Sequence, residues 1–271
     1  MSFTVREPEG RETPVVVEVP HAGLAVDAVA LATLVAPARS LAADADLYVH
    51  ELYADAPAEG ATLLFSHVSR YVCDLNRGEQ DVDALAAETG VGRSAPHGLV
   101  WRTTTEDVPA LLRPIDRAEL ERRLRELYRP YHRTLRELLE RKRQRFGYAV
   151  LLCAHSMPSR GRSGHSDPGC DRADVVPGSR GRTTAASAVI DTPEQVARER
   201  GWTAVHDTPY RGGFSTGHYG RPDAGMHAVQ VEIARRKYMD ERTLAKKPND
   251  FEATREFCRT LVARLGGLGL G

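Results

Sequence analysis

Residues 148–156 read YAVLLCAHS, and this stretch decides what kind of sheet the chain builds. A short, continuous apolar run of this kind is typical of a strand that is buried on both faces. Residues 14–20, PVVVEVP, have the same character and are followed by His21. Two such strands, each followed by a histidine, predict a covered sheet with polar chemistry at the ends of its strands.

Working outward from these strands, strand-like and helix-like segments alternate along the chain. Further strands are predicted at 61–66, 70–75, 202–206 and 227–233, and helices at 46–54, 116–146, 191–200 and 250–265. In the longest segment, Pro130 interrupts an apolar stripe and predicts a kink or a break into two helices. The alternation predicts a layered α/β protein, and no change in composition divides it, so we expect one domain over residues 1–271.

Composition and charge restrict the class of protein. The chain has 271 residues, 41% of them apolar and 27% charged, and its 37 basic residues balance its 37 acidic ones. Because binding to polyanions needs a net basic face, this balance argues against a general nucleic-acid binder. The basic excess in 113–145, 12 Lys or Arg against 6 Asp or Glu, follows an amphipathic helix and indicates a solvated outer face.

Cellular location is predicted from what the sequence lacks. Residues 1–10 contain no apolar core of signal-peptide length, and no apolar run approaches the roughly 20 residues that span a bilayer. The four cysteines form no CxxC pair and are too few for a disulfide scaffold. We therefore expect a cytoplasmic protein with reduced thiols and no membrane partner.

His21 and His155 occupy equivalent places, because each follows or ends a predicted buried strand. In open α/β sheets, ligands bind at the carboxyl ends of the strands. A histidine alone is more often a hydrogen-bonding loop residue, but the matched pair favours a shared zinc ion. A catalytic zinc needs a third protein ligand. It is available among the residues near the start of the first predicted helix: Asp44, Asp46, His50 and Glu51.

A second group of polar residues lies at 74–77, which reads DLNR. Arg77 presents a planar fork that can bind a carboxylate through two hydrogen bonds, and Asn76 adds a neutral amide donor. Arg70 precedes them by seven residues and can join the same site. The simpler alternative for such a dipeptide is a turn at the surface with an ion pair.

Glu232 is the candidate for acid–base chemistry. In the run HAVQVEI, Gln230 and Glu232 point to one face of the predicted strand, and the intervening valines point to the other. A carboxylate on an inner strand is costly unless it has a partner or a task. Glu232 can act as general base toward a water and then as acid toward a leaving amine. A surface-facing strand edge is the alternative.

Two segments rich in glycine are predicted to be loops, and the first of them is a candidate to feed the site. Residues 209–218, PYRGGFSTGH, offer Arg211 and His218 as substrate contacts, with a plain turn as the alternative. The segment lacks the ending of a phosphate-binding loop. Residues 157–183 form a long loop rich in Gly, Pro, Ser and Arg, of a kind that is usually functional.

Seven segments, taken in order, resemble the N-formylglutamate amidohydrolase family. They are VPHAG (19–23), DADLYVHELY (44–53), SRYVCDLNRG (69–78), AHSMPSRG (154–161), DVVPGSRG (174–181), TPYRGGFSTGHYG (208–220) and HAVQVEIARRKYMDE (227–241). The resemblance implies a three-layer αβα fold with a central mixed sheet, of the phosphorylase/hydrolase-like type found in zinc carboxypeptidases and aspartoacylases. In this chain the acid of the carboxypeptidase H-x-x-E pattern is missing, since position 24 is Leu24.

The resemblance also assigns roles to residues. It implies one Zn²⁺ held by His21, His155 and an acid further along the chain, for which Asp46 is the choice and Asp44 the alternative. A site of this composition also accepts other divalent metals. Glu232 resembles the general base of this fold, and Asn76 and Arg77 resemble the element that holds a substrate carboxylate in aspartoacylases. One departure is His50, at a position where the family usually carries an acid.

The activity implied by the resemblance is hydrolysis of the amide of a small N-acyl amino acid, such as N-formyl-L-glutamate, to the acid and the free amino acid. Two alternatives remain. One is a zinc peptidase or cell-wall amidase using the same site, for which an open groove would be expected. The other is a non-catalytic binding protein that retains the fold, which the full set of chemical residues argues against.

Overall fold

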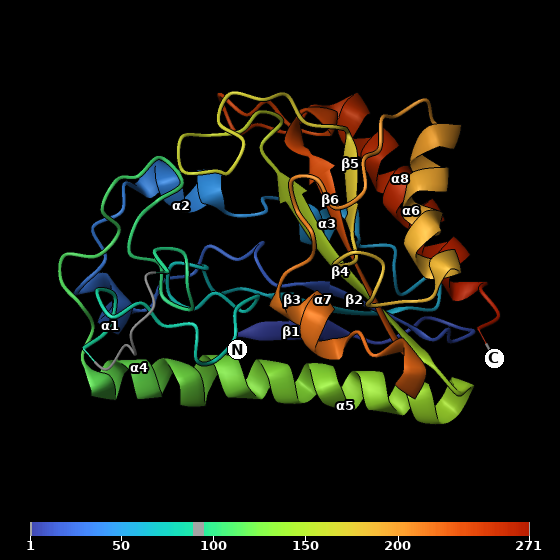
Figure 1. The fold of residues 1–271 in the computed structure, drawn as a ribbon, viewed down its shortest axis with the longest axis horizontal. Helices are drawn as coiled ribbons and strands as arrows, with labels where there is room; N and C mark the ends of the chain where they lie inside the picture. Colours follow the sequence, from blue (N-terminus) through green and yellow to red (C-terminus); the bar gives the residue numbers. More distant parts are fainter. Residues whose placement is uncertain (1, 89–94, 271) are drawn as a thin grey trace.

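The computed structural model of the chain describes residues 2–88 and 95–270 and is built around a mixed six-stranded sheet (Figure 1). The strand order is β1-β3-β2-β4-β6-β5. The strands are β1 (Phe3–Arg6), β2 (Val15–Val19), β3 (Thr62–Ser66), β4 (Ala149–Met157), β5 (Val175–Gly178) and β6 (Met226–Ala234). The four inner strands are parallel, and β1 and β5 are antiparallel edges. The predicted α/β class with a central mixed sheet is confirmed.

The innermost strands explain the apolar runs in the sequence. Every residue of β2, β4 and β6 is buried. A parallel sheet has both faces covered by helices, so its central strands carry apolar side chains in both directions. The polar residues on these strands, such as Glu18 and Glu232, are therefore exceptions that call for a physical explanation.

One face of the sheet is covered by a long helical segment and by α7 (Phe214–Tyr219). The segment comprises α4 (Arg117–Arg123), a π-helical stretch at Leu124–Tyr128 and α5 (Arg129–Phe146). The predicted interruption at Pro130 thus takes the form of a π turn immediately before α5. Pro130 is the second residue of α5, so the N–H that it lacks falls where the segment changes from π-helical to α-helical hydrogen bonding.

The other face is covered by α3 (Val49–Leu52), α6 (Ser187–Glu199) and α8 (Pro248–Gly266), which pack on the opposite side from α5 (Figure 1). The three-layer arrangement expected from the resemblance is therefore present. α6 begins four residues earlier than the predicted start at Asp191, and Pro193 lies inside it. Burial of its apolar side chains against the sheet outweighs the hydrogen bond lost at the proline.

Two strand predictions and one loop prediction differ from the structure. Residues 70–75 form turns, and their apolar side chains are buried by packing rather than by strand pairing. Residues 202–206 contribute only an isolated bridge between Ala204 and Val175. β5 lies within the segment 157–183, which was expected to be loop throughout. Both β1 and β5 are short edge strands of four residues, too short to show a clear periodic pattern.

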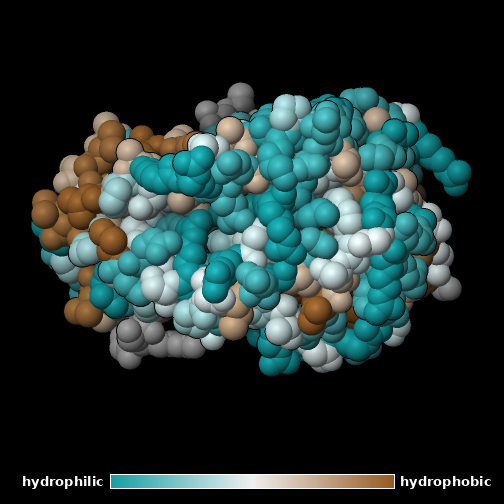
Figure 2. Space-filling view, turned by 90° about the horizontal axis from the view of Figure 1, so that it is seen from above, coloured by the Kyte–Doolittle hydropathy of each residue, from teal (hydrophilic) through white to brown (hydrophobic). Residues whose placement is uncertain are grey.

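Apolar surface is gathered at one end of the molecule, at the left of Figure 2. This end carries α1 (Ala28–Leu31), in which Val29 and Leu31 are exposed. Most of the remaining surface in that view is hydrophilic. Among the described residues, no helix combines the length and the apolar character that crossing a bilayer requires. α2 (Ala38–Asp44) follows α1 and leads the chain toward the ends of the central strands.

Candidate active site

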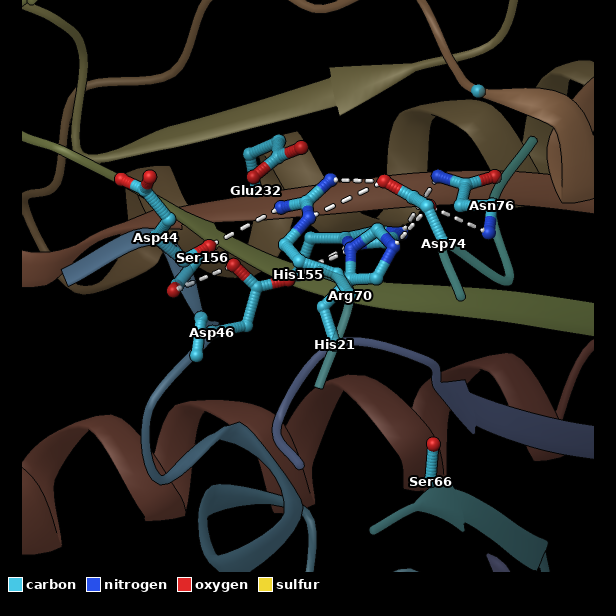
Figure 3. Close-up of polar contacts among 12 residues, drawn as sticks. His21, Asp44, Asp46, Ser66, Arg70, Asp74, Asn76, His155, Ser156 and Glu232 are labelled. Atoms are coloured by element: carbon cyan, nitrogen blue, oxygen red, sulfur yellow. Dashed lines mark hydrogen bonds and ion pairs between the residues drawn. The ribbon is translucent and has the colours of Figure 1, made fainter. Parts of the chain in front are cut away.

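The site lies at the carboxyl ends of the central strands. His21 follows β2 by two residues, while His155 and Glu232 each lie two residues before the end of β4 and β6. β4 and β6 are parallel and in register, so that His155 and Glu232 are direct partners. All three side chains are buried. Figure 3 shows them converging with Asp46 from separate segments of the chain.

His21, Asp46 and His155 form a cluster that can hold a metal ion. Nδ1 of His155 lies 2.9 Å from Oδ2 of Asp46, and Nδ1 of His21 lies 3.5 Å from the same oxygen. One ligand atom from each residue falls within 4.8 Å of the other two. Two imidazoles and one carboxylate are the donor set of many catalytic zinc sites. The structure thus brings together the three residues predicted as ligands.

Asp46 is held in this position by the backbone and by neighbouring side chains. Its N–H donates to the carbonyl of His21 at 2.9 Å, which ties the two ligands together. Ser156 Oγ donates to Oδ1 at 3.2 Å. Burial acts to raise the pKa of Asp46, but hydrogen bonds and charge from His155 and His21 outweigh burial and hold the pKa well below its usual value. The carboxylate is therefore ionised, as a metal ligand must be.

Asp44, the alternative ligand, lies outside the cluster. Its carboxylate accepts hydrogen bonds from Thr105 N–H and Oγ1, from Tyr71 OH, and from Arg162 Nη1 at 2.7 Å. These partners come from three different segments, so the hydrogen bonds of Asp44 hold these segments together at the wall of the site. The other two residues considered are also elsewhere: His50 stacks on Phe65, and Glu51 pairs with Lys246.

Asp74 orients His21, a role that the sequence analysis did not assign. Its Oδ1 lies 2.7 Å from Nε2 of His21, so this nitrogen carries the proton and leaves Nδ1 to face Asp46. Oδ2 accepts from Arg70 at 2.9 Å and from the Trp101 indole at 2.9 Å. Arg70 is therefore already paired, which weakens its prediction as a substrate contact. The sequence did contain a signal for this contact: histidines that bind metals commonly pair with a carboxylate, and Asp74 is the acid of the DLNR segment.

Asn76 and Arg77 lie beside the cluster but differ in their surroundings. Asn76 Oδ1 accepts from the N–H of Ser215 at 2.9 Å, and Nδ2 lies 3.3 Å from Nε2 of His155. Arg77 donates to the carbonyl oxygens of His97 and Asn76. Among the described residues no carboxylate pairs with Arg77, so its positive charge is available to a ligand.

A cavity of about 440 Å³ opens over these residues. Five arginines line it: Arg70, Arg77, Arg162, Arg211 and Arg235. Three of them contact an aspartate: Arg70 pairs with Asp74, Arg162 with Asp44 and Arg235 with Asp46. Within the described ranges, Arg77 and Arg211 have no carboxylate partner. The cavity therefore presents two guanidinium groups that form no ion pair with a carboxylate of the described residues.

Part of the segment 157–183 closes one side of this cavity through Gly164, His165 and Ser166. His165 is not among the site residues predicted from the sequence. Its Nδ1 accepts from the N–H of Arg162 and from Nη2 of Arg172, each at 3.0 Å. Burial, with the charges of Arg172 and Arg162, lowers the pKa of His165 to about 4. The imidazole is therefore neutral near pH 7, with its proton on Nε2.

His218 does not line this cavity. Its ring stacks on Phe214 with the centroids 4.8 Å apart, and it borders a separate surface hollow with Arg180. The prediction that His218 contacts the substrate is therefore not supported by its position. The short distance in sequence between Arg211 and His218 does not place them together, because α7 begins at Phe214 and carries His218 away from the strand ends.

Glu232 faces the cavity with a raised pKa. Burial, together with the nearby charge of Asp46, raises the pKa of Glu232 to about 7, while His155, Arg70 and Arg235 act in the opposite direction. No basic side chain of the described residues forms an ion pair with it. A carboxyl group whose pKa lies near neutrality can both accept and return a proton, as general acid–base catalysis requires.

Comparison with known proteins agrees with this geometry. Residues 13–239 match the family model described as N-formylglutamate amidohydrolase. The chain is 35% identical to N-formylglutamate deformylase from Pseudomonas aeruginosa, with 93% of this chain and 92% of that protein covered. It is also 35% identical to N-formylglutamate deformylase from Pseudomonas putida, with 84% and 82% covered.

A solved structure extends the comparison to the fold. The crystal structure of N-formylglutamate amidohydrolase from Ralstonia eutropha superposes with a TM-score of 0.89 at 31% sequence identity. The match covers 98% of this chain and 97% of that one. The segments that build the site, from His21 to Glu232, all fall within the matched family model. The chain belongs to the N-formylglutamate amidohydrolase family.

Proposed function

We propose that this protein is a metal-dependent deformylase that hydrolyses N-formyl-L-glutamate, or a closely similar N-formyl amino acid, to formate and the free amino acid. The observation that carries the proposal is the buried His21–Asp46–His155 cluster with Glu232 beside it. The names of the relatives supply the substrate class.

The cluster suits a divalent metal ion on chemical grounds. Its two Nδ1 atoms face one ionised carboxylate, and Asp74 fixes the proton of His21 on the opposite nitrogen. Zinc is the ion we expect, and other divalent ions fit a site of this composition. When bound, such an ion supplies Lewis acidity, which lowers the pKa of a water and stabilises negative charge on the amide oxygen.

Glu232 carries the proton transfers. The carboxylate removes a proton from the water that attacks the formyl carbon, and it delivers this proton to the amide nitrogen as the C–N bond breaks. Burial, which raises the pKa of this carboxyl group, suits both steps. Burial excludes bulk water that would otherwise exchange the proton and weaken the electrostatic interactions in the site.

Arg77 and Arg211 bind the two carboxylates of N-formyl-L-glutamate. They are the cavity-lining arginines that form no ion pair with a carboxylate of the described residues. The substrate provides two negative charges, which match the two positive charges in number. Asn76 and the neutral Nε2–H of His165 add hydrogen-bond donors to the same cavity.

A walled cavity of about 440 Å³ favours a small substrate over a polymer. The stretch around His165 forms one wall of it, where a peptidase or cell-wall amidase would need an open groove. A purely binding protein would have no need for an acid–base residue beside the metal cluster.

The proposal is tested by formate release from N-formyl-L-glutamate, comparing the wild-type protein with Glu232→Gln. Loss of the general base is expected to lower kcat by about 10² to 10⁴. Metal content, measured by atomic emission, should be unchanged, since Glu232 is not among the three ligands. Equal rates in the two proteins would refute the role of Glu232, and a wild-type protein without formate release would refute the substrate.

A further inference from the structure

A second row of polar residues crosses the sheet next to the metal cluster, two residues before His155 and Glu232 on their strands. Glu18 of β2 pairs in register with Cys153 of β4, which pairs with Gln230 of β6. The row is buried, with Gln230 only 3% exposed. Because side chains two apart on a strand share a face, Gln230 lies on the same side of the sheet as Glu232.

The amide of Gln230 makes two hydrogen bonds that fix its orientation. Oε1 accepts from the backbone N–H of Gly213 at 2.8 Å. Nε2 donates to Oε1 of Glu232 at 2.9 Å. A backbone N–H can only donate, so the oxygen of the amide must face Gly213 and its NH₂ must face Glu232.

Gly213, which donates to the amide oxygen of Gln230, is itself held in a fixed position. It is the N-cap residue of α7, and a β-carbon at this position would lie 2.3 Å from Nδ2 of Asn76. Two residues later the N–H of Ser215 donates to Oδ1 of Asn76. The start of α7 is thus fixed by two side-chain amides of the site, two residues after Arg211.

We propose that Gln230 is a positioning residue that aims the carboxylate of Glu232 and ties it to the segment carrying Arg211. Within the described residues, Gln230 is the one side chain that hydrogen-bonds to Glu232. The bond holds Oε1 and leaves Oε2 free to face the cavity. This inference rests on the proposed function of Glu232. It adds that Gln230 connects the general base to the segment that binds the substrate.

Two substitutions separate the two hydrogen bonds. Gln230→Glu retains an acceptor for the N–H of Gly213 but loses the NH₂ that donates to Glu232. Its second carboxyl oxygen either repels Glu232 or shares a proton with it, and in both cases the base is impaired. We expect kcat on N-formyl-L-glutamate to fall by about tenfold or more, with KM within about twofold of wild type.

Gln230→Met keeps the length of the side chain and removes both bonds. Here kcat should fall and KM should rise, because the segment carrying Arg211 also loses one of the two side-chain amides that hold it. Cys153→Ala is the matched control: Cys153 is the buried register partner of Gln230 and touches neither Glu232 nor Gly213 through a hydrogen bond. Its kcat and KM should remain within about twofold of wild type.

Crystal structures of wild-type protein and Gln230→Met, both loaded with zinc, supply a readout that does not depend on turnover. The carboxylate of Glu232 should be displaced or adopt several conformers in the variant, while His21, Asp46 and His155 superpose. An unmoved Glu232 together with wild-type kcat in Gln230→Glu would overturn the inference. If wild-type protein released no formate, the substrate proposal would fall, and the position of Glu232 in the two crystal structures would decide the role of Gln230.

Discussion

His155 and Glu232 are register partners in the adjacent parallel strands β4 and β6. The proposed metal ligand and the proposed general base are therefore separated by one strand spacing, set by the backbone hydrogen bonds of the sheet. Rigid elements hold reacting groups more accurately than loops do. The remaining ligands, His21 and Asp46, come from loops, but the hydrogen bond from Asp46 N–H to the His21 carbonyl ties them to the same edge.

Asp44, the last residue of α2, and Asp46, which lies between α2 and α3, should respond differently to substitution. Asp46→Asn removes the charge from the metal cluster and should cost most of the bound zinc. Asp44→Asn, its control, removes the charge that faces Arg162 and should leave zinc affinity within a fewfold of wild type while lowering the melting temperature. Isothermal titration with zinc and thermal unfolding measure the two effects. Equal loss of zinc binding in both variants would contradict the assignment of Asp46.

Arg77 and Arg211, the cavity-lining arginines without an ion-pair partner among the described residues, should control substrate affinity. Arg77→Met and Arg211→Met are each expected to raise KM for N-formyl-L-glutamate by about tenfold to a hundredfold, as the loss of a charge-assisted hydrogen bond implies. One of the two should have little effect on N-formyl-L-glutamine, whose side chain carries no charge. Steady-state kinetics with both substrates checks this. Unchanged KM values in both variants would show that the carboxylates bind elsewhere.

Glu18 makes folding stability depend on pH in the metal-free protein. Burial raises its pKa to about 7, against the charge of His155 and a hydrogen bond from Ser215. Its other close neighbours are the thiol of Cys153 and the hydroxyl of Tyr131. The ordinary value, which applies to the unfolded chain, is 4.5. Between these values the folded chain keeps a proton that the unfolded chain has lost.

The stabilising effect of protonated Glu18 is therefore complete below about pH 4.5 and is lost as the pH rises through 7. Glu18→Gln does not titrate, so its free energy of unfolding relative to wild type should increase by about 2 to 3 kcal/mol between pH 5 and pH 8. Urea denaturation of both metal-free proteins at the two pH values measures it. A difference between the proteins that does not change with pH would contradict this account.

Much of the fold and part of the site could be predicted from the sequence for a physical reason. Strands buried on both faces need uninterrupted apolar residues, so β2, β4 and β6 stand out, and the polar residues at their ends mark the ligand-binding edge. His21 and His155 follow from this rule. The resemblance to a known family then narrowed the third ligand to Asp46 or Asp44.

The rest depends on contacts between distant residues, which local sequence does not encode. Asp44 and Asp46 are only two residues apart in the sequence. Thr105 and Arg162 nevertheless hydrogen-bond to Asp44, while His155 hydrogen-bonds to Asp46. Arg70 and Arg77 look alike in sequence, but only Arg70 finds an aspartate partner within the described part of the chain. Which arginine remains free for a ligand is settled by tertiary packing.

The central claim is that metal held by His21, Asp46 and His155 is required for deformylation, and the most direct test is formate release from N-formyl-L-glutamate before and after chelation. The account predicts that metal-loaded protein releases formate, that the chelated and dialysed protein does not, and that one equivalent of zinc per chain restores the rate. Formate release that persists at full rate in protein shown to contain no metal would contradict the account.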